Sequence, residues 1–322
     1  MKQVTIVIPD CRVNLNSVMG AYDILSRANL YWQEAGHVSG INIQIAAFVK
    51  EVVSHNNYLA IHPIDIRQIK QSHLVIVPAV LGAYEETIQN NQALIEWVRQ
   101  QYAGGAEIAS MCSGAFLLAA TGLLDGKVCS VHWNKAEIFR QMYPAITTAE
   151  DKVITVENGI YTNGGAYSFL NLVIYLVEKL FDRATAIWCS KVFQVDMERT
   201  TQSPFMIFEG QKGHGDEVIS QAQAYIENNM DEKISFEKLA TQLAISRRNF
   251  DRRFIKATGN TPVEYLQRVK IEAARKELEK GRKTIFEVMN EVGYADDKAF
   301  REVFKRITGL SPIEYKSKYA VN

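Results

Sequence analysis

The second half of the chain contains one short pattern twice, and this repeat restricts the possible folds more than any other feature. Residues 258–266 read TGNTPVEYL, and residues 308–316 read TGLSPIEYK. In each copy the glycine can end one helix, and the following Thr-Pro or Ser-Pro can begin the next. The repeat therefore predicts two copies of one helical unit.

A second pattern precedes each copy. Two phenylalanines stand four residues apart and so share one face of a helix: Phe250 with Phe254, and Phe300 with Phe304. Ser246 and Asp296 stand where these helices should begin, and each can accept a hydrogen bond from a free backbone N–H group. A short apolar helix and a tight turn come before them. We therefore predict two helix-turn-helix units, joined by a long helix over about 262–279.

The outer faces of the two second helices are rich in charge. An arginine-rich face on a short helix suits the major groove of DNA, because a guanidinium group can bond two atoms of a guanine edge while other cations hold phosphates. The predicted DNA-contacting residues are Arg247, Arg248, Asp251, Arg252, Lys256, Asp297, Lys298, Arg301, Glu302 and Lys305. A helical bundle whose arginines only solvate its surface is the alternative, which the second copy of the pattern disfavours.

The segments LAISRRNFDRRF and GYADDKAFREVFKRITGLSPIEY resemble the AraC/XylS family of bacterial transcription regulators. The resemblance covers residues 218–319. It implies double-stranded DNA as a partner, a homodimer and contact with RNA polymerase. Activation of transcription is the expected role, with repression as the open alternative. By position it assigns base reading to Arg248, Asp251 and Arg252 in the first unit and to Asp297, Lys298, Arg301 and Glu302 in the second.

Residues 3–180 follow a different pattern, in which short β-branched runs alternate with helical segments. This pattern predicts a flavodoxin-like, doubly wound α/β domain with a parallel sheet. The predicted strands are 3–8, 41–48, 74–77 and 106–111, with further β signals near 128–131, 152–157 and 160–162. The predicted helices are about 17–29, 90–101, 114–121, 135–142 and 166–180. We predict domains at 1–201 (α/β sensor) and 218–322 (all-α, DNA-binding), with a linker at 202–217 where prolines and glycines interrupt the chain.

One cysteine stands where a strand runs directly into a helix. In residues 106–126, AEIASMCSGAFLLAATGLLDG, Cys112 lies at this junction and Gly114 follows two residues later. Such a turn exposes the side chain and aims helix N–H groups at it, which predicts a lowered thiol pKa. His132 could reach the thiol, and a Cys–His pair is the minimum for covalent catalysis.

CSGAFLLAATGLLDG followed by VHW resembles the ThiJ/PfpI branch of the class I glutamine-amidotransferase-like fold, in the form that is fused to AraC-type domains. The enzymes of that branch carry an early glutamate, where this chain has Asn16 and Ser17. Their glycine pair after the third strand is replaced by PAVLG, with only Gly82. Asn171 stands where related regulators carry an aspartate. We therefore predict a catalytically degenerate domain that has no acid to orient His132.

The carboxyl ends of the strands are the expected ligand site of such a sheet. The predicted pocket residues are Cys112, Ser113, His132, Trp133 and Gly82. For Cys112 three roles remain open: a pocket or scaffold residue, an oxidation-responsive thiol, and a working nucleophile. The predicted function is a DNA-binding transcription regulator that senses a small molecule, and the resemblance points to a nitrogenous metabolite. The alternatives are a cysteine-dependent amidase or glyoxalase-like hydrolase, a redox sensor acting through Cys112, and a non-specific nucleic-acid-binding protein.

The composition and the sequence pattern exclude several other classes of protein. No apolar run approaches the roughly 18 residues of a membrane span, and the opening MKQVTIVIPD is too short an apolar stretch for a secretion signal. We therefore expect a cytoplasmic protein without a membrane partner. The four cysteines are far apart, with neither a C-x-x-C pair nor a histidine cluster beside them. No metal site, disulfide or cofactor is predicted.

Overall fold

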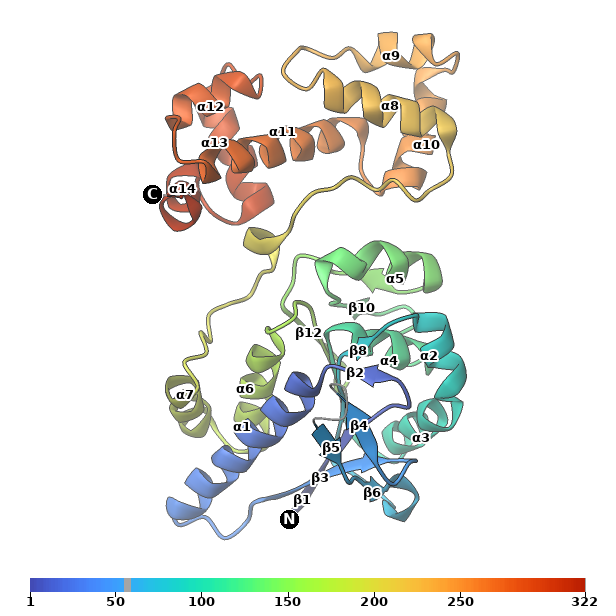
Figure 1. The fold of residues 1–322 in the computed structure, drawn as a ribbon, viewed down its shortest axis with the longest axis vertical. Coiled ribbons are helices and arrows are strands. Elements are labelled where there is room, and N and C mark those ends of the chain that lie inside the picture. Colours follow the sequence, from blue (N-terminus) through green and yellow to red (C-terminus); the bar gives the residue numbers. More distant parts are fainter. Residues whose placement is uncertain (55–58, 322) are drawn as a thin grey trace. The chain divides into compact units, whose positions relative to one another are not determined.

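The computed structural model describes residues 1–54 and 59–321. The chain divides into two compact units, Met1–Gln202 and Ser203–Asn322, which are described in turn (Figure 1).

The first unit is built on a seven-stranded sheet with the order β12-β13-β9-β7-β1-β3-β6. Its strands are β1 (Lys2–Val7), β3 (Ile41–Ala47), β6 (Ile64–Asp65), β7 (Leu74–Val77), β9 (Glu107–Met111), β12 (Ile154–Glu157) and β13 (Ile160–Asn163). Counted along the chain, the five central parallel strands β1, β3, β7, β9 and β13 stand in the order 2-1-3-4-5. This is the flavodoxin-like order, which confirms the predicted fold class.

Helices cover both faces of this sheet, and each face has its own apolar core. The helices are α1 (Leu15–Glu34), α2 (Tyr84–Asn90), α3 (Gln92–Ala103), α4 (Ala115–Ala120), α5 (Ala136–Met142), α6 (Phe169–Leu180) and α7 (Arg183–Val192). One core joins the sheet to α1, α6 and α7, and the other joins it to α3, α4 and α5. Burial on both faces explains why the strands are runs of β-branched residues without polar alternation.

Three short two-stranded ribbons complete the unit. They are β2 (Arg12–Val13) with β8 (Val80–Leu81), β4 (Val52–Ser54) with β5 (Leu59–Ile61), and β10 (Val128–Cys129) with β11 (Thr147–Thr148).

The sheet is not wholly parallel, which corrects the prediction at one edge. β12 runs antiparallel to β13 through a two-residue turn at Asn158 and Gly159. Both turn residues have positive φ, 50° and 74°, as a type I′ hairpin requires. The Asn-Gly pair is the sequence signal that would have revealed this hairpin.

Two helices, α2 and α7, were not predicted. The helix expected at 90–101 is α3, and α2 precedes it. The two are separated at Asn91, whose Oδ1 accepts from the Asp10 N–H (2.7 Å) and whose Nδ2 donates to Thr87 O (2.8 Å). The break therefore ties this point of the chain to the end of β1. Helix α7 is capped by Asp182, which accepts a hydrogen bond from the Thr185 N–H at 2.8 Å.

The second unit is entirely helical and confirms the two helix-turn-helix units. Its helices are α8 (Glu217–Asn228), α9 (Phe236–Gln242), α10 (Arg247–Thr258), α11 (Pro262–Glu279), α12 (Ile285–Glu291), α13 (Asp297–Thr308) and α14 (Pro312–Tyr319). Ser246 and Asp296 cap α10 and α13 as predicted. Helix α11 ends the first repeat and begins the second, with the bounds that the sequence indicated.

The repeated sequence pattern corresponds to a repeated core. Phe254 packs edge-on against Tyr265 with ring centroids 5.3 Å apart, and Phe304 packs against Tyr315 at 5.5 Å. The Tyr265 hydroxyl donates to Glu227 Oε1 at 2.6 Å, and the Tyr315 hydroxyl donates to Glu279 Oε1 at 2.5 Å. Helices α10 and α13 are thus each held through one of their own phenylalanines, which packs on a tyrosine of the following helix whose hydroxyl is hydrogen-bonded.

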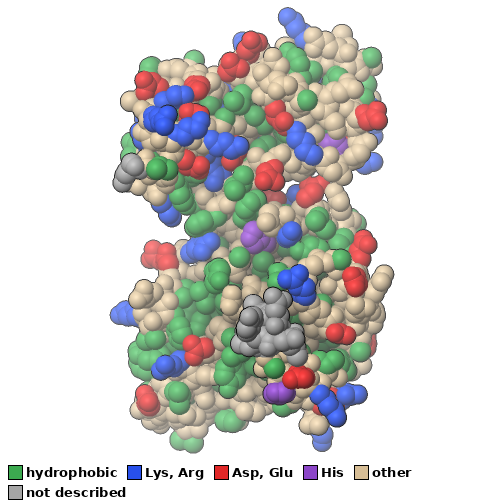
Figure 2. All heavy atoms as spheres, in the orientation of Figure 1, with side chains coloured by type: hydrophobic (Ala, Val, Ile, Leu, Met, Phe, Trp, Pro, Cys, Tyr) green, Lys and Arg blue, Asp and Glu red, His purple; other side chains and the backbone are tan. Residues whose placement is uncertain are grey.

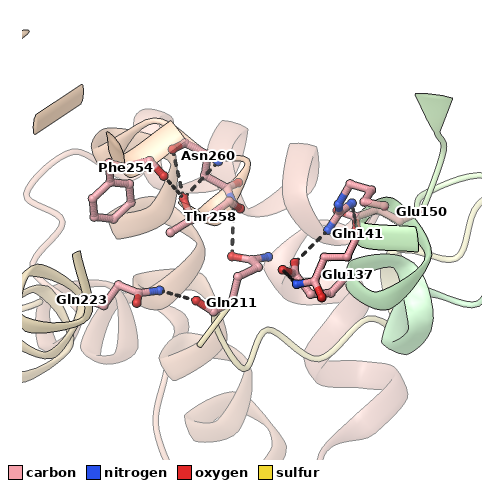
Figure 3. A network of polar contacts seen from close by, with 9 residues as sticks. Glu137, Gln141, Glu150, Gln211, Gln223, Phe254, Thr258 and Asn260 are labelled. Carbon is pink, nitrogen blue, oxygen red and sulfur yellow. Dashed lines mark hydrogen bonds and ion pairs between the residues drawn. The ribbon is translucent and has the colours of Figure 1, made fainter. Parts of the chain in front are cut away.

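The C-terminal ends of α10 and α13 are also built alike. Thr258 Oγ1 donates to Phe254 O at 2.8 Å and accepts from the Asn260 N–H at 3.1 Å, as Figure 3 shows. Gly259 then has a φ of 68°, and Gly309 in the second repeat has a φ of 75°. This left-handed conformation explains why a glycine follows the threonine in both copies.

Residues 203–216, here called the arm, are the first part of the second unit and pack against its helices. Arg275 donates to the main-chain oxygens of Pro204 and Met206. The Phe208 ring lies 5.2 Å from Tyr265, and Gln223 Nε2 donates to Gln211 O at 2.8 Å (Figure 3). Most of the predicted linker at 202–217 is therefore bound along the helices that follow it.

Candidate DNA-contacting helices and ligand site

Helix α10 presents three cations to solvent. Arg248, Arg252 and Lys256 are exposed, because Phe250 and Phe254 turn the opposite face into the core, where both are fully buried. Arg252 makes one contact on its own helix, from its guanidinium to Asn249 Oδ1 at 3.0 Å. These three side chains are therefore open to a partner on the outer face of α10.

The other two predicted residues of α10 bond each other. Arg247 Nε lies 3.0 Å from both carboxylate oxygens of Asp251, and its guanidinium carbon lies 5.6 Å from the centre of the Phe236 ring. Arg247 therefore holds α10 against α9. A half-exposed i, i+4 pair contributes only about 0.3–0.5 kcal/mol, so a DNA phosphate or base could compete for either partner.

Helix α13 repeats this arrangement with weaker basic character. Arg301 Nε lies 2.7 Å from Asp297 Oδ2, and the Asp297 carboxylate raises the pKa of Arg301. Lys298, Glu302 and Lys305 are exposed. In Figure 2 Lys and Arg side chains gather over the region of α12 and α13. The structure thus places the predicted residues of both helices on the outer faces, with two of them paired in each.

Arg253 is a cation of α10 that does not face outward with the others. Its guanidinium makes two hydrogen bonds to Asp216, at 2.6 and 2.9 Å, and Asp216 also caps α8. The Arg253 guanidinium lowers the pKa of Asp216. This ion pair fixes the end of the arm to α10.

In the first unit, Cys112 occupies a strained turn between β9 and α4. Its φ is 51°, and 8% of its surface is exposed. A Cβ on Gly114 would lie 2.5 Å from Pro78 O and 2.8 Å from Val77 O, so only glycine lets the turn pack against the end of β7. The Cys112 backbone thus has the geometry of a nucleophile elbow.

The thiol of Cys112 is nevertheless not activated. Burial raises its pKa, and this outweighs the lowering by hydrogen bonds from Ser113 and by the charge of Lys135. The prediction of a lowered pKa is therefore wrong, because the turn encloses the sulfur and does not expose it. A thiol with a raised pKa is protonated near neutral pH and is a poor nucleophile.

His132 is turned toward its own chain segment. Its Nδ1 accepts from the Asn134 N–H at 3.2 Å, and its ring centre lies 5.5 Å from that of Trp133. Burial, with a smaller effect of the Lys135 charge, lowers its pKa. In the described part of the chain no hydrogen bond joins His132 to Cys112.

The side chains of Ser17 and Asn171, at two of the positions that are compared above with the enzymes and regulators of the family, and that of Ser113 are hydrogen-bonded to the main chain. Ser17 Oγ donates to Asn14 O (2.7 Å) and accepts from the Ala79 N–H (3.2 Å). Ser113 Oγ donates to Val80 O at 2.6 Å. Asn171 Nδ2 donates to Asp196 O at 2.5 Å. The Ala79 N–H, which lies in the segment that would supply oxyanion donors in an enzyme, is therefore already bonded.

The other cysteines behave as core residues. Burial raises the pKa of Cys11 to about 11, of Cys129 to about 12 and of Cys189 to about 11. Within residues 1–54 and 59–321, no three His, Cys, Asp or Glu side chains are grouped so that they could hold a metal ion. Nor does any helix of these residues combine the length and apolar character that crossing a bilayer requires.

Three polar residues that the sequence analysis missed lie near the end of β13. Asn163, Ser168 and Gln202 are at most 1% exposed, and each has one side-chain oxygen without a hydrogen-bond partner in the described part of the protein. The run Asn-Gly-Gly directly after a predicted strand was a usable signal, because such strand ends commonly bind ligands. No local pattern pointed to Gln202.

Comparison with known proteins finds a matching family or domain for each unit. Residues 3–179 match the sequence profile of the DJ-1/PfpI family, and residues 239–318 match that of a helix-turn-helix domain. The HTH-type transcriptional regulators GbdR and CdhR of Pseudomonas aeruginosa are similar to this chain, at 23% and 21% identity over 68% and 72% of it. The matched regions span 59% of GbdR and 69% of CdhR.

A solved structure shares the fold of the first unit. The crystal structure of a putative transcriptional regulator protein from Vibrio parahaemolyticus aligns with 59% of this chain and 98% of its own, with 19% identity and a TM-score of 0.54.

Proposed function

This chain belongs to the DJ-1/PfpI family, and from that membership together with its helix-turn-helix domain we propose that it is a transcription regulator. In this proposal α10 and α13 bind specific sites on double-stranded DNA, and the α/β unit senses a small molecule. The names of GbdR and CdhR, both HTH-type transcriptional regulators, support the same role.

The observation that carries the proposal is the double recognition helix. Both α10 and α13 turn a pair of fully buried phenylalanines inward and charged residues outward. Helix α11, which joins the repeats, has 18 residues and is therefore about 27 Å long. That length is of the order of one DNA turn, roughly 34 Å, which separates successive major-groove segments.

We infer further that the α/β unit is not an enzyme. The Cys112 pKa is raised, the Ala79 N–H is occupied, and Asn171 bonds the main chain of Asp196. Loss of the orienting acid alone costs on the order of 10⁴-fold in a Ser-His-Asp enzyme. The hydrolase alternative is therefore not favoured, and the raised thiol pKa also argues against a redox sensor that acts through a thiolate.

The sensing role uses the strand ends around Cys112, Ser113, His132, Trp133 and Gly82. A ligand there would alter DNA binding through different affinities for two states of the protein, typically about 1–3 kcal/mol of coupling. A homodimer, contact with RNA polymerase, activation of transcription and a cytoplasmic location belong to the same proposal and rest on the family resemblance.

The direct test is selection of binding sites from a library of random DNA duplexes, with the full-length protein and at physiological salt. We expect enrichment of a bipartite motif whose halves are about one helical turn apart. A scrambled duplex of the same length and base composition is the control. Equal affinity for the enriched and the scrambled duplex would contradict sequence-specific regulation and favour non-specific binding.

A further inference from the structure

Three buried oxygen atoms near the end of β13 lack hydrogen-bond partners among residues 1–54 and 59–321: Asn163 Oδ1, Ser168 Oγ and Gln202 Oε1. We call them the oxygen cluster. Their residues are 0%, 1% and 1% exposed. Folded proteins rarely leave such atoms unpaired, because removing them from water without a replacement bond lowers stability. A cluster of three at one place therefore calls for a bound partner.

The three residues converge on one pair of glycines. A Cβ on Gly165, which has a φ of 93°, would lie 2.6 Å from Ser168 Oγ and 3.5 Å from Gln202 Oε1. A Cβ on Gly164 would overlap the Gln202 side-chain amide. Asn163 directly precedes the pair, and its Nδ2 donates to Gly164 O at 3.0 Å. The cluster thus joins the end of β13, the start of α6 and the last residue of the first unit.

The cluster lies beside the elbow of Cys112. Asn163 pairs with Met111 across the parallel strands β13 and β9, and Cys112 is the residue after Met111. Gln202 Nε2 donates to Val131 O at 3.1 Å, one residue before His132. Ligands of open α/β sheets bind at these carboxyl ends. The oxygen cluster therefore borders the candidate pocket from a side that the sequence prediction did not include.

The neighbouring bonds fix which atoms face the ligand. The Asn163 amide nitrogen donates to Gly164 O and Val153 O, at 3.0 and 3.2 Å. The Gln202 amide nitrogen donates to Val131 O and to Lys152 O, at 3.1 and 2.8 Å. Turning either amide over would place an oxygen against carbonyl oxygens, so both amides must present their own oxygens. Only a hydrogen-bond donor can satisfy these two atoms.

We propose that the oxygen cluster binds the N–H groups of an uncharged carboxamide or ureide, which acts as the effector. This assignment deepens the proposed sensing role and rests on it. A quaternary ammonium group has no N–H to offer. A buried ammonium ion would need a carboxylate to offset its desolvation, whereas the amides of Asn163 and Gln202 are surrounded by neutral main-chain carbonyls. Gln202 is the last residue of the first unit and directly precedes the arm, so the ligand would contact the residue at which the first unit ends.

The test is isothermal titration of the full-length protein with propionamide, urea, hydantoin and allantoin, and with tetramethylammonium as the ion without N–H groups. We expect at least one of the four amides or ureides to bind, and tetramethylammonium not to bind. Ser168→Ala should weaken that binding about tenfold, the effect of losing one hydrogen bond. Ser168 makes no capping bond to α6, so this variant should fold. Ser190→Ala, on α7, is the matched control and should bind as the wild type does.

Several results would overturn the assignment. They are no binding of any of the four compounds, equal binding of tetramethylammonium, and unchanged affinity in Ser168→Ala. A crystal structure with only ordered waters on the three oxygens, and the bound compound elsewhere, would do the same. Failure of the proposed function would look different, because it would show as absence of DNA selectivity in the ligand-free protein whatever the titrations give.

Discussion

Gln223 and Arg275 occupy equivalent positions in the two helical repeats, and each donates to the buried tyrosine hydroxyl of its own repeat. The distances are 3.1 Å from Gln223 to Tyr265 and 2.9 Å from Arg275 to Tyr315. Both side chains also donate to main-chain oxygens of the arm. The same position therefore performs the same two tasks in each repeat, with an amide in one and a guanidinium in the other.

Replacing Arg275 should strongly destabilise the second unit. Arg275 is 6% exposed and pairs at 3.1 Å with Glu272, which is 8% exposed. Arg275→Gln keeps a donor for Tyr315 but leaves the Glu272 carboxylate buried without its cation, which typically costs about 3–5 kcal/mol. Urea denaturation followed by circular dichroism measures the loss.

The matched control for this prediction is the double variant Arg275→Gln with Glu272→Gln. It removes both charges and should recover a large part of the lost stability, because no unpaired charge remains buried. If the double variant is as unstable as Arg275→Gln alone, the loss comes from the arm contacts and not from the ion pair.

Two cations of α10 should affect DNA binding in different ways. Arg252→Ala should weaken binding to the selected site by about 1–3 kcal/mol and relax the preference at one base pair, as expected for a base-reading arginine. Lys256→Ala should weaken binding to all sequences alike and reduce the salt slope by about 1. Fluorescence anisotropy with selected and scrambled duplexes at several salt concentrations measures both effects.

Lys191→Ala removes one charge from α7 of the first unit and is the control for net charge. Its affinity should match that of the wild type. Equal losses in Arg252→Ala on selected and scrambled duplexes would show that Arg252 contacts phosphate only.

Alkylation of Cys112 should be slow in the folded protein. Because burial raises the thiol pKa, the thiolate fraction near neutral pH is lower than in the unfolded chain, and it rises only as the pH approaches the raised pKa. Iodoacetamide labelling at pH 7 to 9, followed by peptide mass spectrometry, should show slower reaction of Cys112 in the native than in the urea-unfolded protein. Faster labelling in the native protein would restore the activated-thiol hypothesis.

The ion pair between Asp216 and Arg253 should give a pH-dependent contribution to stability. The pKa of Asp216 is lowered in the folded protein, so its stabilising effect is complete above the unfolded pKa of about 3.9 and is lost as the pH falls through the lower folded pKa. Asp216→Asn keeps a capping side chain, and we expect it to cost about 1 kcal/mol.

Urea denaturation at pH 7, 5 and 3.5 tests this dependence. The difference between wild type and Asp216→Asn should be equal at pH 7 and 5 and smaller at pH 3.5. A difference that grows as the pH falls would mean that the carboxylate does not stabilise the fold.

Local patterns in the sequence predicted those parts of the structure that depend on neighbouring residues. The spacing of Phe250 and Phe254 gave the buried face of α10, and the Thr-Gly-x-Thr-Pro pattern gave both the end of α10 and the start of α11. The β-branched runs gave the central strands, because strands buried on both faces need such residues.

Contacts between distant residues could not be predicted in this way. The interruption at Asn91 depends on Asp10, and the docking of the arm depends on Arg275, which lies some seventy positions later. The raised pKa of Cys112 depends on how the turn is enclosed in three dimensions, whereas the sequence showed only that a turn exists. The unpaired oxygen of Gln202 could not be predicted either, because it depends on contacts with residues that are distant in the sequence.

The attachment of the arm has a consequence for signalling. Its first half is fixed to the second repeat through Pro204, Met206 and Arg275, and its second half to the first repeat through Gln211 and Gln223. A displacement of residue 203 would therefore strain hydrogen bonds to both repeats. The side chains that make these bonds, Gln223 and Arg275, also donate to the buried hydroxyls of Tyr265 and Tyr315, which support α10 and α13. Release of the arm would remove a hydrogen-bonded neighbour from behind Tyr265 and from behind Tyr315 in one event, so we expect the two repeats to respond together.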